Sequence, residues 1–301
     1  FFFWMVLPYI LIAIMAHVGA RVVYSLGKAV TEARELGNYR LVERLGQGGM
    51  GEVWKAKHRL LARPAAVKLI RASNIGDAQS REGVRRFERE AQATAGLSST
   101  HRVPLFDFGV ADDGSFFYVM ELLAGLELEW FVQDHGPMRA ERVIYVLRQV
   151  CHSLAEAESY GLVHRDIKPA NLFLCRYGGE HDFVKVLDFG IAKAAPDMLE
   201  TGAIGLTQDN MLQGTPAYIA PEQVRNTSRV DGRADIYATG CVAYFLLTGR
   251  PVFTGKSPMD VVVHHTHTPP TAPSVGSELP IPPALDRLIL DCLAKDPADR
   301  W

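Results

Sequence analysis

The sequence predicts an α+β protein of two lobes, in which a β-rich lobe is followed by a mainly helical one. Two observations lead to this fold class. Between Tyr39 and Leu123 the apolar residues alternate mostly as they do in strands, with one clear helix among them. From residue 124 onward they recur mainly at the spacing of helices. We also expect a transmembrane helix ahead of both lobes.

The composition favours a folded enzyme and argues against several other classes of protein. Of the 301 residues, 48% are hydrophobic and 22% are charged, which is too apolar for a disordered chain. The 32 Lys and Arg residues nearly balance the 34 Asp and Glu residues, so we expect no nucleic-acid partner. The four cysteines form no C-x-x-C pair, and we interpret them as free thiols in a reducing compartment.

The chain starts with an apolar run that is long enough to cross a bilayer. Residues 1–20 contain no Asp, Glu, Lys or Arg, and about 20 apolar residues span a hydrocarbon core as a helix. A buried or interfacial helix and a signal peptide are alternatives, although no basic segment precedes the run. Arg21 and Lys28 follow it, which favours a cytoplasmic location for the rest of the chain. Because the first residue is Phe1 rather than Met, we expect a fragment.

These patterns divide the chain into three parts and predict elements within them. The parts are a transmembrane helix over residues 1–26, a juxtamembrane linker over 27–38, and a domain over 39–301 whose lobes are 39–123 and 124–301. In the first lobe we expect strands over Pro64–Ile70 and Phe116–Leu123 and a helix over Arg81–Leu97. In the second lobe we expect helices around Val143–Leu154, Ala234–Leu247 and Leu285–Leu293, strands around Leu172–Leu174 and Val184–Val186, a loop over Pro196–Gln213 and an irregular segment over Pro269–Pro283.

A glycine-rich segment in the first lobe has the spacing of a phosphate-binding loop. Gly46–Gly51 matches G-x-G-x-x-G, a pattern that also occurs in dinucleotide folds and in plain hairpins. A dinucleotide loop leads into a helix, whereas Glu52–Ala56 has the pattern of a strand. We therefore expect a strand–turn–strand flap whose glycines let the backbone approach phosphates.

Lys68 lies inside the apolar strand that follows the flap, where a charged side chain needs a partner. That partner should come from the helix predicted over Arg81–Leu97. Glu82, Glu88 and Glu90 are the candidates, and Glu90 lies beside the apolar stripe of this helix. With a phosphate-binding flap upstream, Lys68 is predicted to bind phosphate.

The segment His164–Asn171 and the later Asp188 carry the strongest chemical signal. The segment contains an acid, two bases and an amide within eight residues, and neither a helical period nor strand alternation explains this spacing of polar residues. Phosphoryl transfer needs positioning, metal ions and an acceptor for the hydroxyl proton. We expect Asp166 to accept that proton and Lys168 to stabilise the transferred group. Asn171 and Asp188 would hold Mg²⁺ through their oxygens.

From about Tyr39 to Arg300 the chain resembles the eukaryotic-type (Hanks-type) serine/threonine protein kinases of bacteria, because these motifs follow one another in the family's order. The resemblance implies a bilobal kinase fold, ATP, Mg²⁺ (with Mn²⁺ as a substitute) and protein substrates with Ser or Thr. It selects Glu90 as the partner of Lys68, and Lys168 marks the serine/threonine group. It implies that ATP is bound by Leu45, Gly46, Gln47, Gly48, Gly49, Met50, Gly51, Val53, Ala66, Lys68, Met120, Glu121 and Leu123, with Met120 as gatekeeper and Glu121–Leu123 as hinge.

The same resemblance assigns an activation loop to Asp188–Glu222 and regulation to residues in and near it. Thr207 is the favoured phosphosite and Thr201 the second, and Arg165 would receive the phosphate. Structural and substrate-docking roles fall to Thr215, which would support Asp166 and Lys168, to Glu222 paired with Arg300, and to Asp235 beneath the catalytic segment.

Three features depart from the family or invite another interpretation. Ser98–Pro104 lacks the usual sequence after the regulatory helix, so we expect an irregular lobe junction. The chain stops at Trp301, where the family would complete a final helix, so we expect a shortened second lobe. We interpret His264, His265 and His267 as ordinary polar sequence of the family rather than as a metal site.

The resulting hypothesis is a serine/threonine kinase in signal transduction, tethered to the inner or plasma membrane with its catalytic domain in the cytoplasm. Activation-loop autophosphorylation would regulate it, and two copies could pair for phosphorylation in trans. The alternatives are a pseudokinase that serves as a nucleotide-binding scaffold, and a membrane receptor whose soluble domain only binds a ligand. A pseudokinase usually lacks one of Lys68, Glu90, Asp166, Asn171 and Asp188, and all five are present.

Overall fold

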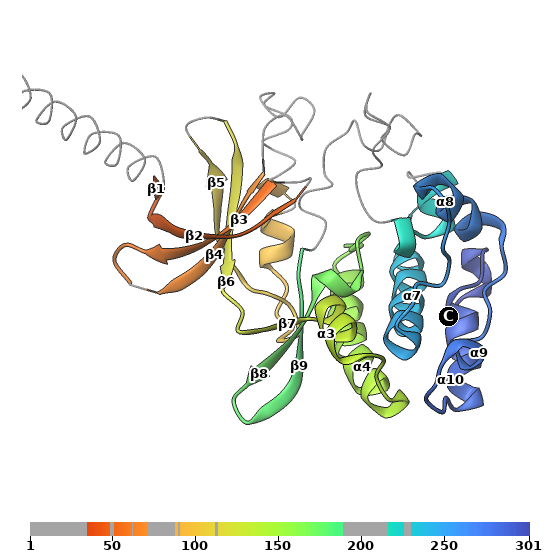
Figure 1. Ribbon diagram of the computed structural model, residues 1–301. Coiled ribbons are helices and arrows are strands. Elements are labelled where there is room, and N and C mark those ends of the chain that lie inside the picture. Colours follow the sequence, from red (N-terminus) through yellow and green to blue (C-terminus); the bar gives the residue numbers. More distant parts are fainter. Residues whose placement is uncertain are drawn as a thin grey trace, which may run out of the picture.

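The structure is a computed structural model that describes residues 35–48, 51–61, 63–70, 88–89, 91–111, 114–188, 216–225 and 230–301. It confirms the predicted bilobal architecture: one end of the molecule is a β-sheet and the other is helical (Figure 1). The transmembrane helix predicted over residues 1–26 lies outside these ranges. None of the helices described in these ranges combines the length and the apolar character of a membrane span.

The first lobe is a six-stranded antiparallel sheet with the strand order β1-β2-β3-β4-β6-β5. Its strands are β1 (Glu35–Leu36), β2 (Tyr39–Gly48), β3 (Gly51–His58), β4 (Pro64–Ile70), β5 (Leu105–Val110) and β6 (Phe116–Glu121). The strand predicted to reach Leu123 therefore ends two residues earlier. Of the predicted helix over Arg81–Leu97, the described residues 88–89 and 91–95 are helical.

Both faces of this sheet carry buried apolar residues. Successive side chains of a strand point to opposite sides, so neighbouring residues belong to different faces. On one face the buried residues are Tyr39, Leu41, Ala56, Ala65, Val67, Phe117 and Val119. The other face carries Ala66, Ile70, Phe116, Tyr118 and Met120, with Val53 and Leu123 packed against them. Lys68 shares this second face, since it is two residues from Ala66 on β4. The strand alternation thus places Lys68 on the same face of the sheet as Ala66 and Met120.

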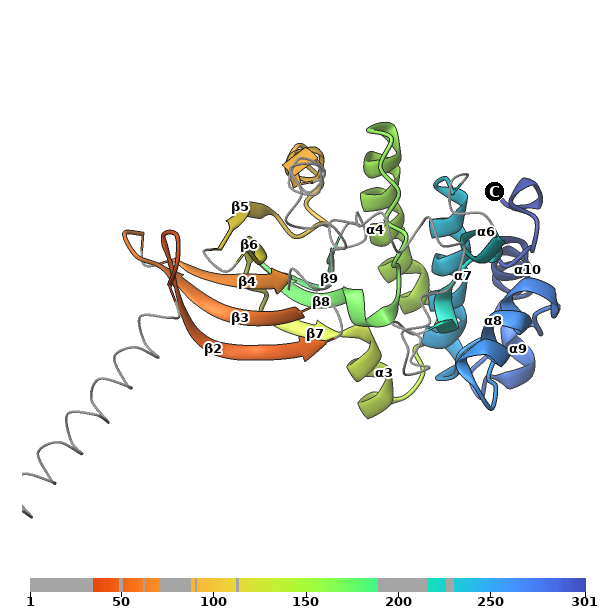
Figure 2. The same ribbon diagram turned by 90° about the horizontal axis from the view of Figure 1, so that it is seen from above.

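A small sheet lies between the large sheet and the helices (Figure 2). It consists of β7 (Gly125–Glu127), β8 (Leu172–Tyr177) and β9 (Glu180–Val186). The junction over residues 97–104 is made of turns and one parallel bridge between Arg102 and Val186. The Glu156 carboxylate accepts hydrogen bonds from the backbone of Ser98 and Ser99 at 2.6 and 2.7 Å. The described junction is therefore irregular and is fixed by a side chain of the second lobe.

The second lobe is a bundle of helices around α7 (Arg233–Thr248). The other described helices are α3 (Leu128–His135), α4 (Ala140–Ser159), α6 (Pro221–Arg225), α8 (Pro258–His267), α9 (Pro273–Gly276) and α10 (Pro283–Cys292), with 3₁₀ turns at Pro169–Asn171, Pro216–Tyr218 and Pro297–Asp299. Most residues of α7 are buried, as expected for a helix that is apolar on nearly every side. The segment predicted to be irregular contains α9, which begins at Pro273, and proline is well suited to a first helical turn.

Candidate active site

The glycine-rich segment forms the end of the β2–β3 hairpin, where Gly48 pairs with Gly51. Gly51 has φ of 146°, and a Cβ at this position would lie 1.8 Å from the carbonyl oxygen of Leu69. Only glycine permits this close approach of β3 to β4. Leu45 on β2 is 49% exposed. Gly49 and Met50 at the tip lie outside the described residues.

Four of the residues predicted to bind ATP come together on one face of the sheet. Ala66 and Met120 are directly opposite each other on β4 and β6, and Val53 and Leu123 pack into the same apolar cluster. The predicted hinge begins where β6 ends, at Glu121. The Glu121 carboxylate forms an ion pair with Lys185 of β9 at 3.1 Å, a contact that was not predicted.

Lys68 and Asp188 form an ion pair across the two lobes. The Lys68 ammonium lies 2.5 Å from Oδ2 of Asp188, and the hydroxyl of Tyr118 donates a hydrogen bond to Oδ1. Burial alone would raise the pKa of Asp188, but the Lys68 charge and the two hydrogen bonds lower it below its usual value. Burial and the nearby Asp188 charge raise the pKa of Tyr118. Glu90, the predicted partner of Lys68, lies outside the described residues.

Asp235, at the start of α7, holds the backbone of the segment His164–Asn171, the catalytic segment. Its two carboxylate oxygens accept hydrogen bonds from the backbone N–H groups of His164 and Arg165, at 2.7 and 2.8 Å. Arg165 has φ of 61°, a left-handed conformation that costs free energy for a non-glycine residue. The side chain of Gln223 donates to the Arg165 carbonyl at 3.1 Å. The buried carboxylate and this amide therefore fix an unfavourable turn immediately before Asp166.

Asp166, Lys168 and Asn171 form a compact polar group. The Lys168 ammonium lies 3.0 Å from Oδ2 of Asp166. The Asn171 amide donates to the same oxygen at 3.0 Å and to the Asp166 carbonyl at 2.8 Å. The backbone of Leu187, next to Asp188, donates to the Asn171 carbonyl at 2.9 Å. This bond connects the catalytic segment to the chain that carries Asp188.

The chemistry of Asn171 and Asp188 fits a hard divalent cation. Both hydrogen bonds that the Asn171 side chain forms with described residues use its amide nitrogen, so its amide oxygen is the atom it can offer to a cation. Asp188 adds a carboxylate. The described residues contain no group of three or more His, Cys, Asp or Glu side chains that could form a metal cage. One or two oxygen ligands from the protein, completed by substrate phosphates, are typical of Mg²⁺ sites.

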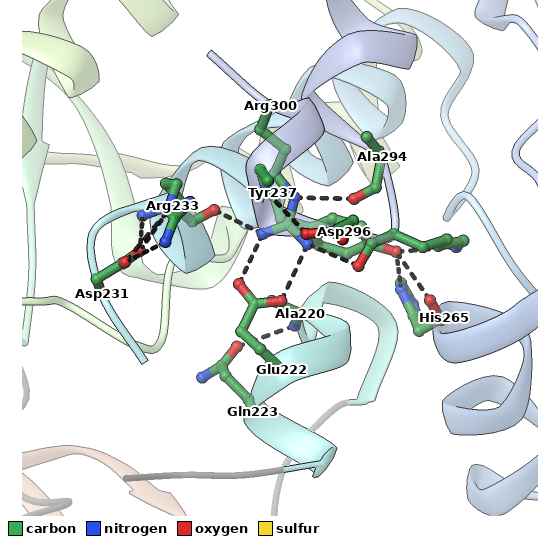
Figure 3. A network of polar contacts seen from close by, with 12 residues as sticks. Ala220, Glu222, Gln223, Asp231, Arg233, Tyr237, His265, Ala294, Asp296 and Arg300 are labelled. Atoms are coloured by element: carbon green, nitrogen blue, oxygen red, sulfur yellow. Dashed lines mark hydrogen bonds and ion pairs between the residues drawn. The ribbon is translucent and has the colours of Figure 1, made fainter. Parts of the chain in front are cut away.

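The end of the chain is tied to α6 by a buried ion pair, shown in Figure 3. The Arg300 guanidinium donates to both oxygens of Glu222, at 2.6 and 2.9 Å, in a bidentate arrangement. It also donates to the carbonyls of Arg233 and Ala294 and lies 4.8 Å from the centre of the Tyr237 ring. The structure thus brings together the two residues that the resemblance paired.

A second polar cluster adjoins this ion pair at the hydroxyl of Tyr237. The Tyr237 hydroxyl lies 2.9 Å from Nδ1 of the fully buried His265, and Lys295 donates to the same hydroxyl at 3.3 Å. Burial and the nearby Lys295 lower the pKa of His265 to about 4. Burial lowers the pKa of Lys295 to about 8. His264 and His267 instead contact the hydroxyls of Thr268 and Thr266.

Some predicted residues are not described by the structure, and two residues that were not predicted make notable contacts. Thr201, Thr207 and Thr215 lie outside the described residues, so their roles stay predictions. Tyr118 and Lys185 were not predicted, and both contacts join residues far apart in the chain. A weak signal existed for each, because a hydroxyl or an ammonium inside an apolar strand needs a buried partner.

Comparisons with known proteins agree with this geometry. The sequence matches the family described as protein kinase domain over residues 39–301. It is 39% identical over 263 residues to serine/threonine-protein kinase pkn3 of Myxococcus xanthus, covering 87% of this chain and 47% of that protein. It is 40% identical over 266 residues to serine/threonine-protein kinase PknB of Mycobacterium tuberculosis, covering 87% of this chain and 40% of that protein. The chain therefore spans less than half the length of either relative.

Solved structures show the same similarity. The kinase domain of PknI from Mycobacterium tuberculosis matches with a TM-score of 0.67 and 27% sequence identity. The match covers 89% of this chain and 92% of that one, so it includes both lobes.

Proposed function

Because the chain belongs to the protein kinase family, and within it to the bacterial serine/threonine kinases, we propose that it transfers the γ-phosphate of ATP to serine or threonine of protein substrates. The main support is the arrangement of Asp166, Lys168 and Asn171 in one hydrogen-bonded group, connected through Leu187 to Asp188. Positioning and electrostatic stabilisation are what phosphoryl transfer requires from a protein.

Each residue of this group has a distinct task in the proposed reaction. Asp166 accepts the proton of the attacking hydroxyl, and its carboxylate is oriented by the Asn171 amide. Lys168, 3.0 Å from that carboxylate, supplies positive charge beside the transferred phosphoryl group. Lys68, on β4 of the first lobe, binds the phosphates. Asn171 and Asp188 would hold Mg²⁺, which would supply positive charge that neutralises the phosphates.

The adenine would lie against the apolar face of the first lobe. Ala66, Met120 and Val53 belong to one cluster there, so an aromatic base would meet carbon atoms on this side. The backbone of the hinge from Glu121 to Leu123 would read the edge of the base. The glycine-rich hairpin would cover the phosphates with its backbone N–H groups.

We also propose regulation by phosphorylation of the activation loop, at Thr207 or Thr201. A phosphate there would pair with Arg165, whose backbone is held by Asp235 and Gln223. Phosphorylation in trans would need two copies of the chain to meet. Mass spectrometry of the protein after incubation with Mg-ATP would identify the modified residues. Unmodified Thr201 and Thr207 in an active enzyme would contradict this assignment.

Membrane attachment through residues 1–26 remains part of the proposal, with the catalytic domain on the cytoplasmic side where ATP is found. The apolar run and the Arg21 and Lys28 that follow it support this location. Cell fractionation with and without residues 1–26 tests it. Recovery of the intact protein in the soluble fraction would contradict membrane attachment.

The proposed reaction is tested by the identity of the phosphorylated amino acid. Incubation of the protein with Mg-ATP and a general protein substrate should yield phosphoserine or phosphothreonine. Phosphotyrosine alone would contradict the serine/threonine assignment. Nucleotide binding without any phosphate transfer would favour the pseudokinase alternative.

A further inference from the structure

Tyr118 is a buried tyrosine in the middle of β6, and its hydroxyl has a specific target. The residue is 2% exposed, and its neighbours on the same face of the strand are Phe116 and Met120. A hydroxyl buried among apolar side chains costs free energy unless it forms a hydrogen bond. Here the hydroxyl donates to Oδ1 of Asp188, a residue 70 positions later in the chain.

The sheet register explains how Tyr118 reaches that carboxylate. In the antiparallel pair of β4 and β6, Lys68 is directly opposite Tyr118. Residues opposite each other in such a pair project from the same face of the sheet. The Lys68 ammonium and the Tyr118 phenol therefore lie next to each other on this face. The Lys68 nitrogen is 5.7 Å from the centre of the Tyr118 ring.

The two donors divide the Asp188 carboxylate between them. Lys68 holds Oδ2 and Tyr118 holds Oδ1, each with a donor–acceptor distance of 2.5 Å. Asp188 itself has φ of 56°, a left-handed conformation that persists only where surrounding contacts hold it. The carboxylate is thus held at both oxygens by one face of the first lobe.

The two donors differ in what they do when a nucleotide arrives. The Lys68 ammonium is charged, so phosphate oxygens compete with Asp188 for it. The Tyr118 hydroxyl is neutral, so it leaves the negative charge of the carboxylate for a cation. Since a carboxylate has about four lone-pair sites on its two oxygens, a hydrogen bond at Oδ1 leaves Oδ2 fully able to bind a metal.

We propose that Tyr118 is a positioning residue for the divalent metal: its hydroxyl anchors Oδ1 of Asp188, so that Oδ2 is presented first to Lys68 and then to the cation. This inference rests on the proposed kinase function, because it assumes that Asp188 binds the metal of a metal–nucleotide complex. It assigns a function to a side chain that acts through another residue, Asp188. A hydroxyl that instead competed with the metal would have the opposite effect on metal affinity.

The test compares metal binding by the full-length chain and by Tyr118→Phe, which removes only the hydroxyl. Mn²⁺ is the probe, and its binding is measured by electron paramagnetic resonance in the presence of a non-hydrolysable ATP analogue. Loss of one hydrogen bond to a charged acceptor should weaken Mn²⁺ binding by about fivefold or more. The affinity for the analogue without metal should stay the same.

Tyr39→Phe is the matched control. Tyr39 is also a buried tyrosine of the first lobe, but it lies in the cluster on the opposite face and packs edge-on against His58. Its replacement should leave Mn²⁺ binding unchanged. Asp188→Asn, in contrast, should abolish the Mn²⁺ signal and thereby identify the site.

Equal or tighter Mn²⁺ binding by Tyr118→Phe would overturn the proposal, as would a failure of the wild-type protein to bind Mn²⁺ with the analogue. If Tyr118→Phe does not fold, Tyr118→Met provides a flexible apolar replacement with the same expected loss. Unfolding of both variants would show that the hydroxyl serves only stability and would also overturn the proposal. A wild-type protein that binds Mn²⁺ as predicted but transfers no phosphate would contradict the proposed kinase function alone.

Discussion

At the scale of single residues, buried groups outside the segment His164–Asn171 hold its backbone in place. Asp235 is the main example, because each of its oxygens accepts a backbone N–H from the turn before Asp166. Burial raises the pKa of Asp235 and therefore disfavours its charged form, even though the two hydrogen bonds and His164 oppose that effect. The two backbone hydrogen bonds therefore offset part of the free energy that burial of this charge costs.

Replacing Asp235 should affect stability and catalysis together. Asp235→Ala leaves two backbone donors without this acceptor, so the free energy of unfolding should fall by about 3 kcal/mol. Asp235→Asn keeps one acceptor oxygen and should lose about half as much. Urea denaturation measures both values. A loss of less than about 0.5 kcal/mol in the alanine variant would contradict the structural role.

His265 predicts a specific dependence of stability on pH. Its pKa in the folded protein is about 4, below the ordinary value of 6.5, and the groups that face it are Tyr237, His264 and Lys295. As the pH falls below 6.5, the unfolded chain binds a proton that the folded protein does not bind. The free energy of unfolding should therefore decrease between pH 6.5 and pH 4, by up to about 3 kcal/mol from this residue.

The contribution of His265 is isolated by substitution. Denaturation of wild type and His265→Gln at several pH values should show a smaller acid-dependent loss in the variant. His135→Gln is the control, because the side chain of His135 is half exposed at the end of α3. Equal pH dependence in wild type and His265→Gln would rule out this role of His265.

At the scale of elements, the Glu222–Arg300 ion pair fastens the chain after α10 to α6 and α7. The Arg300 side chain is fully buried and that of Glu222 nearly so. A buried ion pair contributes little net stability, but removal of one partner leaves an uncompensated charge. Its value is that it fixes where α6 lies relative to α7, and α6 carries the Gln223 that holds the Arg165 carbonyl.

Arg300→Ala should therefore reduce the free energy of unfolding by about 3–5 kcal/mol. Arg300→Lys should restore only part of this loss, because an ammonium cannot reproduce the bidentate contact. Thermal or urea denaturation measures both variants, with the exposed Arg233→Ala as a control for loss of a nearby arginine. Full rescue by lysine would show that charge alone, and not the planar geometry, holds these elements.

The elements themselves were largely predictable, and the contacts between them were not. β4, α4 and α7 agree with the predicted spans to within a few residues because their apolar periods are strong. The catalytic segment could be found because its residues are neighbours in sequence. The contact of Tyr118 with Asp188 could not, since it requires the register of β4 against β6 and the placement of a loop from the other lobe.

At the scale of the whole molecule, a few polar contacts connect the two lobes. Lys68 meets Asp188, and Lys185 of β9 meets Glu121 at the start of the hinge. Lys185 is 5% exposed, and its ammonium also lies near the rings of Tyr177 and Phe183, at 5.4 and 5.8 Å. Glu121 belongs to the proposed adenine-binding hinge. The Lys185–Glu121 ion pair would therefore hold the proposed nucleotide site to the second lobe.

A double-mutant cycle tests the coupling of Lys185 and Glu121. Lys185→Met and Glu121→Gln should each destabilise the protein, and together they should cost less than the sum of the two. The expected interaction energy is about 1–3 kcal/mol, as is typical of residues in direct contact. Urea denaturation of the four proteins gives this value. Strict additivity would mean that the ion pair does not connect the lobes in solution.

The proposed phosphate transfer depends on Asp166, so replacing this residue gives a decisive kinetic comparison. Phosphate transfer from Mg-ATP is measured for wild type and Asp166→Asn at saturating nucleotide, with nucleotide affinity measured in parallel. Loss of the proton acceptor should lower the transfer rate by about 10²–10⁴-fold while the affinity for ATP stays nearly the same. Equal transfer rates in the two proteins would contradict the assignment of this site as the active site of a protein kinase.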